Sequence, residues 1–222
     1  MAFIYHTFEH VGGAAGCTEI REWMLANFPG MFDAYTASAS SLQCKIGDAI
    51  VLTLNNPTNS GAGYVAQAES MGHSFSYSGQ MGYHGVIADT DANVVVFLSG
   101  GGDYPIIVLC QNEDGDTCGV SFNTTNNTTL LTGQSGTLNT VQQSDIFVYN
   151  FTRGTYQKIP CGFARTGQNA VCAYPLIDAS GRKIQNVWVG GSSALRSLVN
   201  PIEIDIDNDI YCSIKYGWLL IK

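Results

Sequence analysis

The hydrophobic and polar positions of this chain follow two periods, one helical and one extended. The helical stripe consists of Ile20, Trp23, Met24 and Phe28. These apolar residues are spaced as on one face of a helix. Thr18 can cap the start of this segment and Pro29-Gly30 can end it. We therefore expect an amphipathic helix over about residues 18–28 that packs on a sheet.

Most of the remaining chain alternates with a period near two, between short runs of Gly, Asn, Asp and Ser. This pattern predicts short strands. The expected strands are 49–54, 94–98, 106–110, 120–122, 145–151, 170–176 and 183–189. Near the C-terminus, isoleucines alternate with acids over 202–207, and alternation resumes from Ile210, which predicts a hairpin around Asn208. The pattern favours a mainly β protein: an antiparallel β-sandwich or barrel with one N-terminal amphipathic helix packed on it.

The composition is that of a folded domain. The chain has 222 residues, of which 45% are hydrophobic, so it can bury a sizeable core and is not intrinsically disordered. We predict a single mainly β domain over residues 1–222. The Asn- and Thr-rich stretch 123–140 is a long loop within it, or alternatively an internal boundary.

Charge is scarce and unevenly distributed. Charged residues make up 13% of the chain and the net charge is −8. Residues 1–152 hold two basic and thirteen acidic side chains, a balance of −11, whereas residues 153–222 hold eight and five, a balance of +3. Nucleic-acid binding is not expected of such a chain, because it requires Lys and Arg to neutralise phosphates. If the two parts lie on different faces, copies should attract head to tail as a homo-oligomer. The predicted interface patch is Arg153, Lys158, Arg165, Arg182, Lys183 and Arg196.

The N-terminal residues and the cysteines predict a protein made in a reducing cytoplasm. From the N-terminal residues we expect no secretory signal, and because the longest apolar runs are too short to span a membrane, we expect no membrane insertion. Seven cysteines without a C-x-x-C pair indicate mainly reduced, buried thiols. Cys110 and Cys118 flank an Asp-Gly turn and should face each other across a hairpin, with their disulfide state left open.

No catalytic constellation is evident, and we expect no enzyme activity, metal or cofactor. Cys17 follows a Gly-rich run at the expected helix N-terminus, where the helix dipole would lower the thiol pKa. With His6 and His10 nearby in sequence, a Cys-dependent hydrolase is a third hypothesis. The four histidines match no usual zinc spacing.

Aromatic residues supply a second hypothesis, a carbohydrate- or receptor-binding adhesin. His73, Phe75 and Tyr77 occupy one face of an alternating segment. An exposed aromatic row could stack on sugar rings, although the same alternation is what a half-buried strand requires, and we favour a core position. The candidate stacking residues are Phe75, Tyr77, Tyr83 and Trp188.

The first half of the chain resembles virion structural proteins of tailed bacteriophages. A Gly-rich lead-in precedes a helix ending in Leu25-Ala-Asn-Phe-Pro-Gly30, followed by the strand sequence of residues 45–52. The sequences of residues 94–98 and 100–109 fit the same pattern. The resemblance implies a mainly β, non-enzymatic tail, neck, baseplate or capsid-decoration protein. Such a protein would be made in the host bacterial cytoplasm and assemble into the virion with its own copies and other virion proteins. An appendage protein could also bind a host-surface glycan. The resemblance assigns no functional residue.

Overall fold

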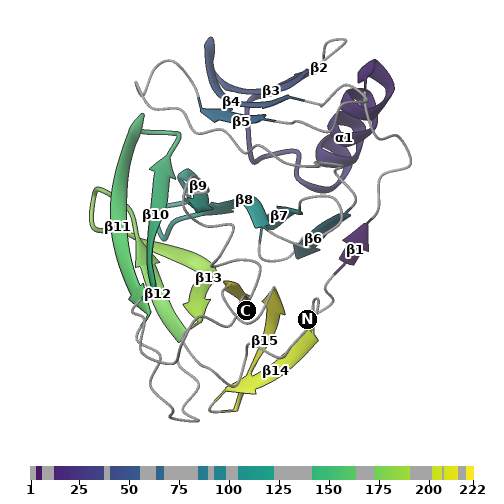
Figure 1. Cartoon of the computed structure of the whole chain (residues 1–222). Helices are drawn as coiled ribbons and strands as arrows, with labels where there is room; N and C mark the ends of the chain where they lie inside the picture. The colour runs from purple at the N-terminus through teal and green to yellow at the C-terminus, as the bar shows by residue number, and fades with distance from the viewer. Residues whose placement is uncertain are drawn as a thin grey trace.

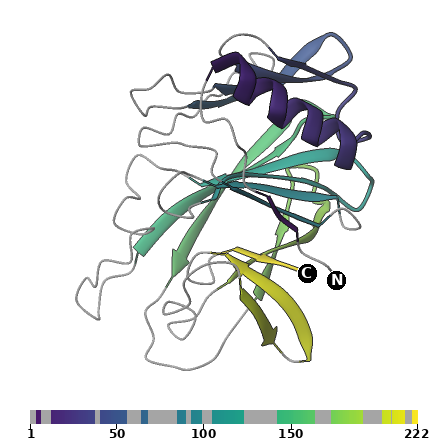
Figure 2. The ribbon, with the colours of Figure 1, turned by 90° about the vertical axis from the view of Figure 1, so that its right-hand side faces the viewer.

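The described part of the chain folds into three antiparallel sheets and one helix, stacked in three layers (Figure 1, Figure 2). The structure is a computed structural model. It describes residues 4–6, 13–37, 41–55, 64–67, 85–89, 93–98, 105–122, 142–163, 173–190, 202–206, 208–214 and 219–222.

The middle layer is a seven-stranded sheet in the order β1-β6-β7-β8-β9-β10-β11. Its strands are β1 (Ile4–His6), β6 (Gly85–Asp89), β7 (Val94–Leu98), β8 (Pro105–Gln111), β9 (Thr117–Phe122), β10 (Gln142–Asn150) and β11 (Thr155–Phe163). From β6 to β11 each strand pairs with the next in sequence, so this part is an antiparallel meander.

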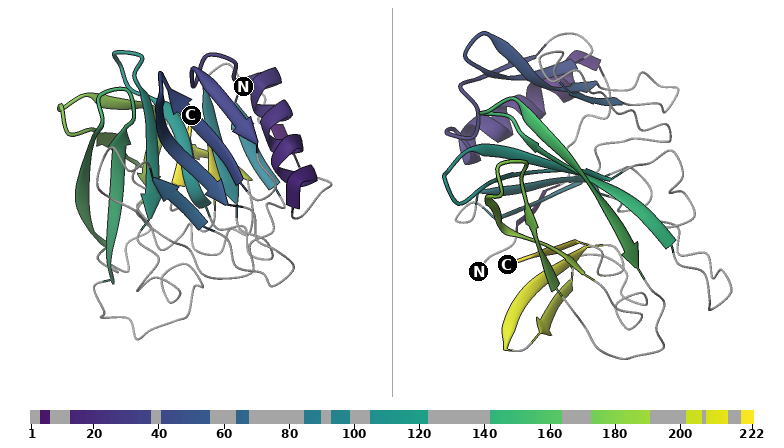
Figure 3. Two further views of the ribbon diagram at one scale, coloured as in Figure 1. Left: turned by 90° about the horizontal axis from the view of Figure 1, so that it is seen from above. Right: turned by 90° about the vertical axis from the view of Figure 1, so that its left-hand side faces the viewer.

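The upper layer combines helix α1 (Gly13–Asn27) with a four-stranded sheet in the order β2-β3-β4-β5. The strands are β2 (Ala34–Ala37), β3 (Ser41–Ile46), β4 (Ala49–Asn55) and β5 (Tyr64–Gln67). Seen from above, α1 lies beside this sheet, and both rest on the middle layer (Figure 3). Arg21 of α1 donates from Nε to the carbonyl of Tyr35 in β2 at 2.8 Å, which joins the helix to the edge of the sheet.

The lower layer is a five-stranded sheet in the order β12-β13-β16-β15-β14. The strands are β12 (Ala173–Ile177), β13 (Lys183–Gly190), β14 (Ile202–Ile206), β15 (Asp209–Ile214) and β16 (Leu219–Ile221). The predicted C-terminal hairpin is present as β14 and β15, with Ile206 opposite Asp209 and Asn208 in a left-handed conformation at φ +71°.

Among the described residues, two separate cores hold the layers together, because successive residues of a strand point to opposite faces of the middle sheet. In β10, Tyr149 faces the upper layer and Val148 the lower one. The upper core contains Ile20, Met24, Phe28, Met31, Phe32, Tyr35, Leu42, Cys44, Val51, Leu52, Val95, Ile107, Leu109, Tyr149 and Phe151. The lower core contains Val94, Val96, Val108, Cys110, Cys118, Val120, Ile146, Val148, Leu176, Ile184, Val187 and Ile221.

The predicted mainly β, antiparallel class with one N-terminal helix is confirmed, and the helix contacts the first sheet as expected. The predicted helix start is wrong. The helix begins at Gly13, so Thr18 is an exposed residue inside it and not its cap. The Gly-rich run contains Ala14 and Ala15, which favour helix, and packing of the apolar stripe in the upper core extends the helix over the glycines.

The possible boundary at 123–140 lies outside the described residues. The strands before and after it, β9 and β10, are neighbours in one sheet, with Val120 opposite Val148. Within the described residues, no helix is long and apolar enough to cross a membrane.

Candidate functional site

Three hairpin turns meet where the middle and lower layers join. They follow β8, β10 and β12, over residues 112–116, 151–154 and 178–182. Two backbone contacts connect the first turn to the start of β13. The Glu113 amide donates to the Lys183 carbonyl at 2.9 Å, and Asn112 forms a bridge with Ile184. We call the polar side chains gathered here the turn cluster: Asn112, Asp114, Asp116, Asn150, Arg153, Asp178 and Arg182.

Asp178 lies at the centre of the turn cluster and is 1% exposed. Its Oδ2 accepts from the side-chain amides of Asn112 at 3.0 Å and Asn150 at 2.8 Å. Its Oδ1 accepts from the backbone amides of Ser180 at 2.8 Å and Arg182 at 3.0 Å. A single carboxylate from the lower layer thus binds two buried asparagines of the middle layer and also shapes its own turn.

Asp116 is the second carboxylate shared by both asparagines. Its Oδ2 accepts from Asn112 at 3.1 Å and Asn150 at 2.8 Å, and it also accepts from Arg153 Nε. The two asparagines therefore bridge Asp116, at the edge of the cluster, and Asp178, at its centre. Donating to two carboxylates from one amide group is favourable because a charged acceptor strengthens each hydrogen bond.

The asparagine oxygens fix the turns themselves. Asn112 Oδ1 accepts from the backbone amides of Asp114 at 3.0 Å and Asp116 at 2.9 Å. Asn150 Oδ1 accepts from the Arg153 amide at 2.9 Å. Such contacts mimic backbone turns and suit asparagine. Both asparagines are fully buried, and these bonds satisfy polar groups that would otherwise be costly to bury.

On the outer side of the cluster, two arginines contact the same carboxylate oxygen. Asp114 Oδ2 lies 2.9 Å from Arg153 Nη2 and 2.9 Å from Arg182 Nε. Arg182 also lies 3.7 Å from Glu113. These groups are partly exposed, so each pair contributes modestly to stability, but together they connect all three turns.

The electrostatics of the cluster favour ionised carboxylates. Burial alone would raise the pKa of Asp178, but hydrogen bonds from Asn150, the Arg182 backbone and Asn112 outweigh it and hold the pKa below its usual value. Burial alone would also raise the pKa of Asp116, but the hydrogen bonds that it accepts from Asn150, Arg153 and Asn112 outweigh this effect and lower the pKa. The cluster is therefore charged at neutral pH and internally bonded.

The geometry of the turn cluster suits a structural clamp between layers. Asp178 and Asp116 point their oxygens at donors of the same chain, and the two asparagines use both of their polar atoms within it. Among the described residues, no group of three or more His, Cys, Asp or Glu side chains is arranged to hold a metal ion.

The structure brings part of the predicted basic patch together and pairs it with acids. Arg153 and Arg182 meet at Asp114, and Lys183 follows Arg182 directly. Lys158 lies further along β11 and is exposed. Arg165 and Arg196 lie outside the described residues. Part of the attraction between the acidic and basic parts of the sequence therefore acts within one chain.

Trp188 is the one predicted stacking aromatic within the described residues. Its ring contacts Tyr211 edge-on at a centroid distance of 5.5 Å, and Lys183 Nζ lies 5.6 Å above it. Lys222 Nζ lies 5.8 Å from the Tyr211 ring centroid, so cations and rings alternate here. Phe75, Tyr77 and Tyr83 lie outside the described residues.

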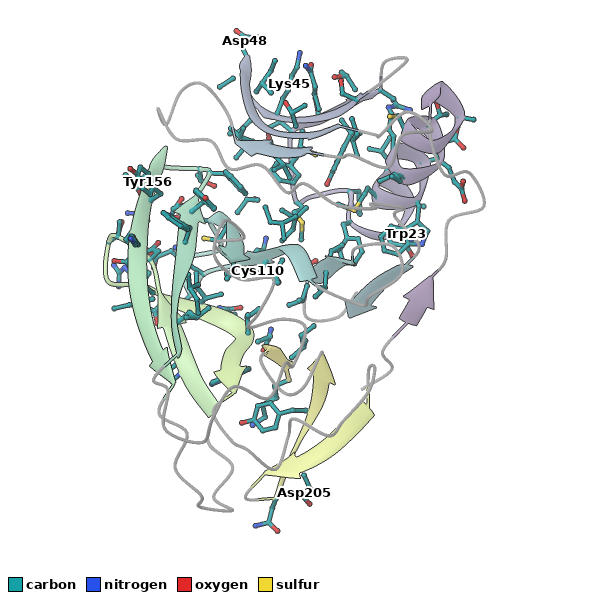
Figure 4. The ribbon with its side chains drawn as sticks, viewed as in Figure 1. Trp23, Lys45, Asp48, Cys110, Tyr156 and Asp205 are labelled. Atoms are coloured by element: carbon teal, nitrogen blue, oxygen red, sulfur yellow. The ribbon has the colours of Figure 1, made fainter. Side chains whose placement is uncertain are left out.

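The four cysteines whose side chains the structure describes, Cys17, Cys44, Cys110 and Cys118, are buried. Cys17 is 0% exposed in the second turn of α1, away from the helix N-terminus that the hydrolase hypothesis requires. Cys110 and Cys118 face each other as predicted, and both are free thiols in the lower core (Figure 4 labels Cys110). Burial raises the pKa of Cys110, and it raises that of Cys118 to about 12, so both are protonated at neutral pH.

The turn cluster was not predicted from the sequence, apart from its first turn. The Asp-Gly tip before Asp116 was predicted and is present, with Gly115 at φ +83°. A lone Asp178 directly after an apolar strand was the signal that could have pointed to the rest, because a buried acid needs partners.

Comparison with protein-family models, with curated proteins and with solved structures finds no match to this chain.

Proposed function

We propose that this chain is a non-enzymatic structural protein of a bacteriophage virion, serving in the tail, neck, baseplate or capsid decoration. In this role it binds its own copies and other virion proteins. The observation that carries the proposal is the layered body, in which α1 and a small sheet cover a larger sheet. A mainly β body of this kind is what the resemblance of the first half implies.

The turn cluster supports a mechanical role. It joins the middle and lower layers through a buried carboxylate and two buried asparagines, so the layers keep a fixed relation. Among the described residues, large apolar side chains are exposed on three elements: Leu25 on α1, Tyr156 on β11 and Ile177 on β12. A rigid body with apolar contact points is suited to assembly.

Light scattering at low and high salt tests this proposal. We expect species heavier than the 23.8 kDa monomer at low salt, with partial dissociation at high salt because ions screen exposed charges. A protein that stays monomeric throughout and binds no other virion protein would overturn it. Mass spectrometry of purified particles supplies an independent readout, since a virion component must be present in them.

A second candidate is an adhesin that binds a host-surface glycan. The half-buried Trp188 ring with Lys183 Nζ above it favours this role, because aromatic rings stack on sugars and ammonium groups bind acidic ones. Tyr211 is buried and contacts the Trp188 ring edge-on, so it positions that ring. Glycan-array binding that is lost in Trp188→Ala and retained in Trp23→Ala would support this role. Absence of binding by the wild type would remove it.

A further inference from the structure

Cys110 and Cys118 lie directly opposite each other on the neighbouring strands β8 and β9. Both side chains are buried in the lower core, and both are free thiols. Cys110 Sγ lies 3.8 Å from the carbonyl oxygen of Cys118, so this sulfur lies against the opposite strand. The fold thus holds two thiols side by side on one face of the middle sheet.

The register determines which kind of cross-strand pair the two cysteines form. Two residues nearer the turn, the Asn112 amide donates to the Asp116 carbonyl at 3.1 Å, so these two residues are a hydrogen-bonded pair. Hydrogen-bonded pairs recur at every second position of an antiparallel ladder, so Cys110 and Cys118 form one as well. The α-carbons of such a pair lie about 5.5 Å apart, which is close to the commonest separation in disulfides, about 5.5–6 Å.

The same register makes a disulfide at this position strained. The β-carbons of a hydrogen-bonded pair lie near the upper end of the cross-strand range of about 4.5–5.5 Å, whereas those of a disulfide lie about 3.5–4.5 Å apart. Closing the bond therefore requires the two β-carbons to approach by about 1 Å. A strained disulfide is reduced more easily than an ideal one, so its formation should depend on the redox conditions.

Cys44 provides the comparison within the same chain. It is also buried and also lies on a central strand of its sheet, β3. The register places Tyr35 and Leu52 opposite it on the two neighbouring strands. Neither of these residues offers a sulfur, so the strand pairing that favours a disulfide at Cys110 is not repeated at Cys44.

The turn cluster restricts access to the cysteine pair. Burial raises the pKa of both thiols, so the reactive thiolate is scarce while the core is closed. The 112–116 turn joins β8 to β9 beside the cysteines. It is held to the lower layer by the hydrogen bond from Asn112 to Asp178 and by the bond from the Glu113 amide to the Lys183 carbonyl. An oxidant therefore reaches the thiols when these contacts open.

We infer that Cys110 and Cys118 are a reversible disulfide site, gated by the turn cluster, which closes when the protein meets a small-molecule disulfide such as oxidised glutathione. One cysteine thiolate attacks a glutathione sulfur and releases one glutathione thiolate, and the other cysteine then attacks the mixed disulfide and releases the second. The two electrons and two protons of the cysteine thiols pass to glutathione, which leaves as two thiol molecules. This chemistry is the same whether or not the protein belongs to a virion.

Peptide mapping after oxidation tests the site. The folded, full-length protein is incubated with oxidised glutathione, its remaining thiols are alkylated in denaturant, and it is digested with a protease that cleaves after acidic residues. Glu113, Asp114 and Asp116 lie between the two cysteines, so cleavage separates them unless a disulfide joins the peptides. We expect a joined pair of peptides that separates on reduction, with Cys44 alkylated.

Two cysteine variants control the mapping. Cys110→Ala should abolish the joined peptides, and Cys44→Ala should leave them unchanged. Any other fate of the two sulfurs in the wild type, as alkylated thiols, mixed glutathione disulfides or bonds to other cysteines, would overturn the site. Excess reduced glutathione should restore both thiols in the folded protein, and a bond that persists there would overturn its reversibility.

The rate of oxidation tests the gate. Asp178→Asn removes the charge that Asn112 and Asn150 bind, so the turn should open more often and the disulfide should form at least about tenfold faster. Gly30→Ala, where nothing lies within 4 Å, is the control and should react at the wild-type rate. Circular dichroism checks that both variants are folded. Should Asp178→Asn fail to fold, Asp114→Asn weakens the outer contacts to Arg153 and Arg182 and should give a smaller increase. Equal rates in the wild type and the folded cluster variant would overturn the gate.

Discussion

The two faces of the middle sheet are buried by different kinds of side chain. The upper core is built mainly from aromatic, Met and Leu residues, and the lower core mainly from Val, Ile and Cys residues. Phe147 and Tyr149 of β10 and Phe151 directly after it project from one face, with the rings of Tyr149 and Phe151 stacked 3° from parallel at 5.9 Å. Ile146 and Val148 project from the other face.

The layers are also positioned by different means. In the upper interface, the Thr117 hydroxyl donates to the Met31 carbonyl, and large side chains fill the space below α1. In the lower interface, smaller side chains pack between the sheets, and the turn cluster fixes the register of one sheet on the other. Bulky side chains can determine a fit by shape alone, whereas small ones benefit from a directional polar contact. The following predictions test this difference.

Truncating two adjacent residues of β10 distinguishes the contributions of the two cores to the free energy of unfolding. Tyr149→Ala should lower the free energy of unfolding by about 3–5 kcal/mol, and Val148→Ala by about 1–3 kcal/mol, because the lost contacts and the cavity scale with side-chain size. Urea denaturation measures both. Equal losses would show that the upper core is no more dependent on its aromatic residues than the lower core is on valine.

Removing the central carboxylate should affect the lower interface. Asp178→Ala leaves the amides of Asn112 and Asn150 without one of their acceptors, and should reduce the free energy of unfolding by about 2–4 kcal/mol. Hydrogen exchange should show faster opening in β12 and β13 than in α1. Uniform loss of protection in all three layers would contradict a local clamp.

Adding one methyl group should disturb the upper interface alone. A Cβ on Gly119 would lie 2.7 Å from Cε2 of Phe151, so Gly119→Ala should cost about 1–3 kcal/mol through overpacking. Gly30→Ala, where nothing lies within 4 Å, is the control and should be near neutral. Thermal unfolding of the two variants compares them, and equal melting temperatures would refute the close approach.

Acid should weaken the lower interface first. The folded-state pKa values of Asp116 and Asp178 are lowered, so their contribution is present above the unfolded value of about 3.9 and is lost as pH falls through the folded values. Stability measured between neutral pH and pH 3 should fall less steeply in Asp178→Asn than in the wild type. An unchanged slope would exclude Asp178 as the titrating group.

Short apolar runs and alternating segments between turn residues were predictable as strands, as β7 and β8 show for the runs and β10 and β13 for the alternating segments, and the Asp-Gly turn placed one hairpin. The strand β11 was missed because Pro160 interrupts its pattern, and its position at a sheet edge is what accommodates that proline. Which layer packs on which face of the middle sheet was not predictable, because the central strands are apolar on both faces. The turn cluster escaped detection since Asn112 and Asn150 are typical turn residues by type. Only the meeting of three turns makes them buried donors.

The size difference between the two faces of β10 also bears on errors in strand alignment. A strand that is apolar on both faces gains little alignment information from hydrophobicity, since a slip by one residue still buries apolar groups. In this protein such a slip would push the Tyr149 ring into a layer lined by Val120 and Val187, and would leave Val148 in a space shaped for an aromatic ring. The difference in side-chain volume therefore destabilises the sheet in which β10 is shifted by one residue, and so favours the correct strand alignment.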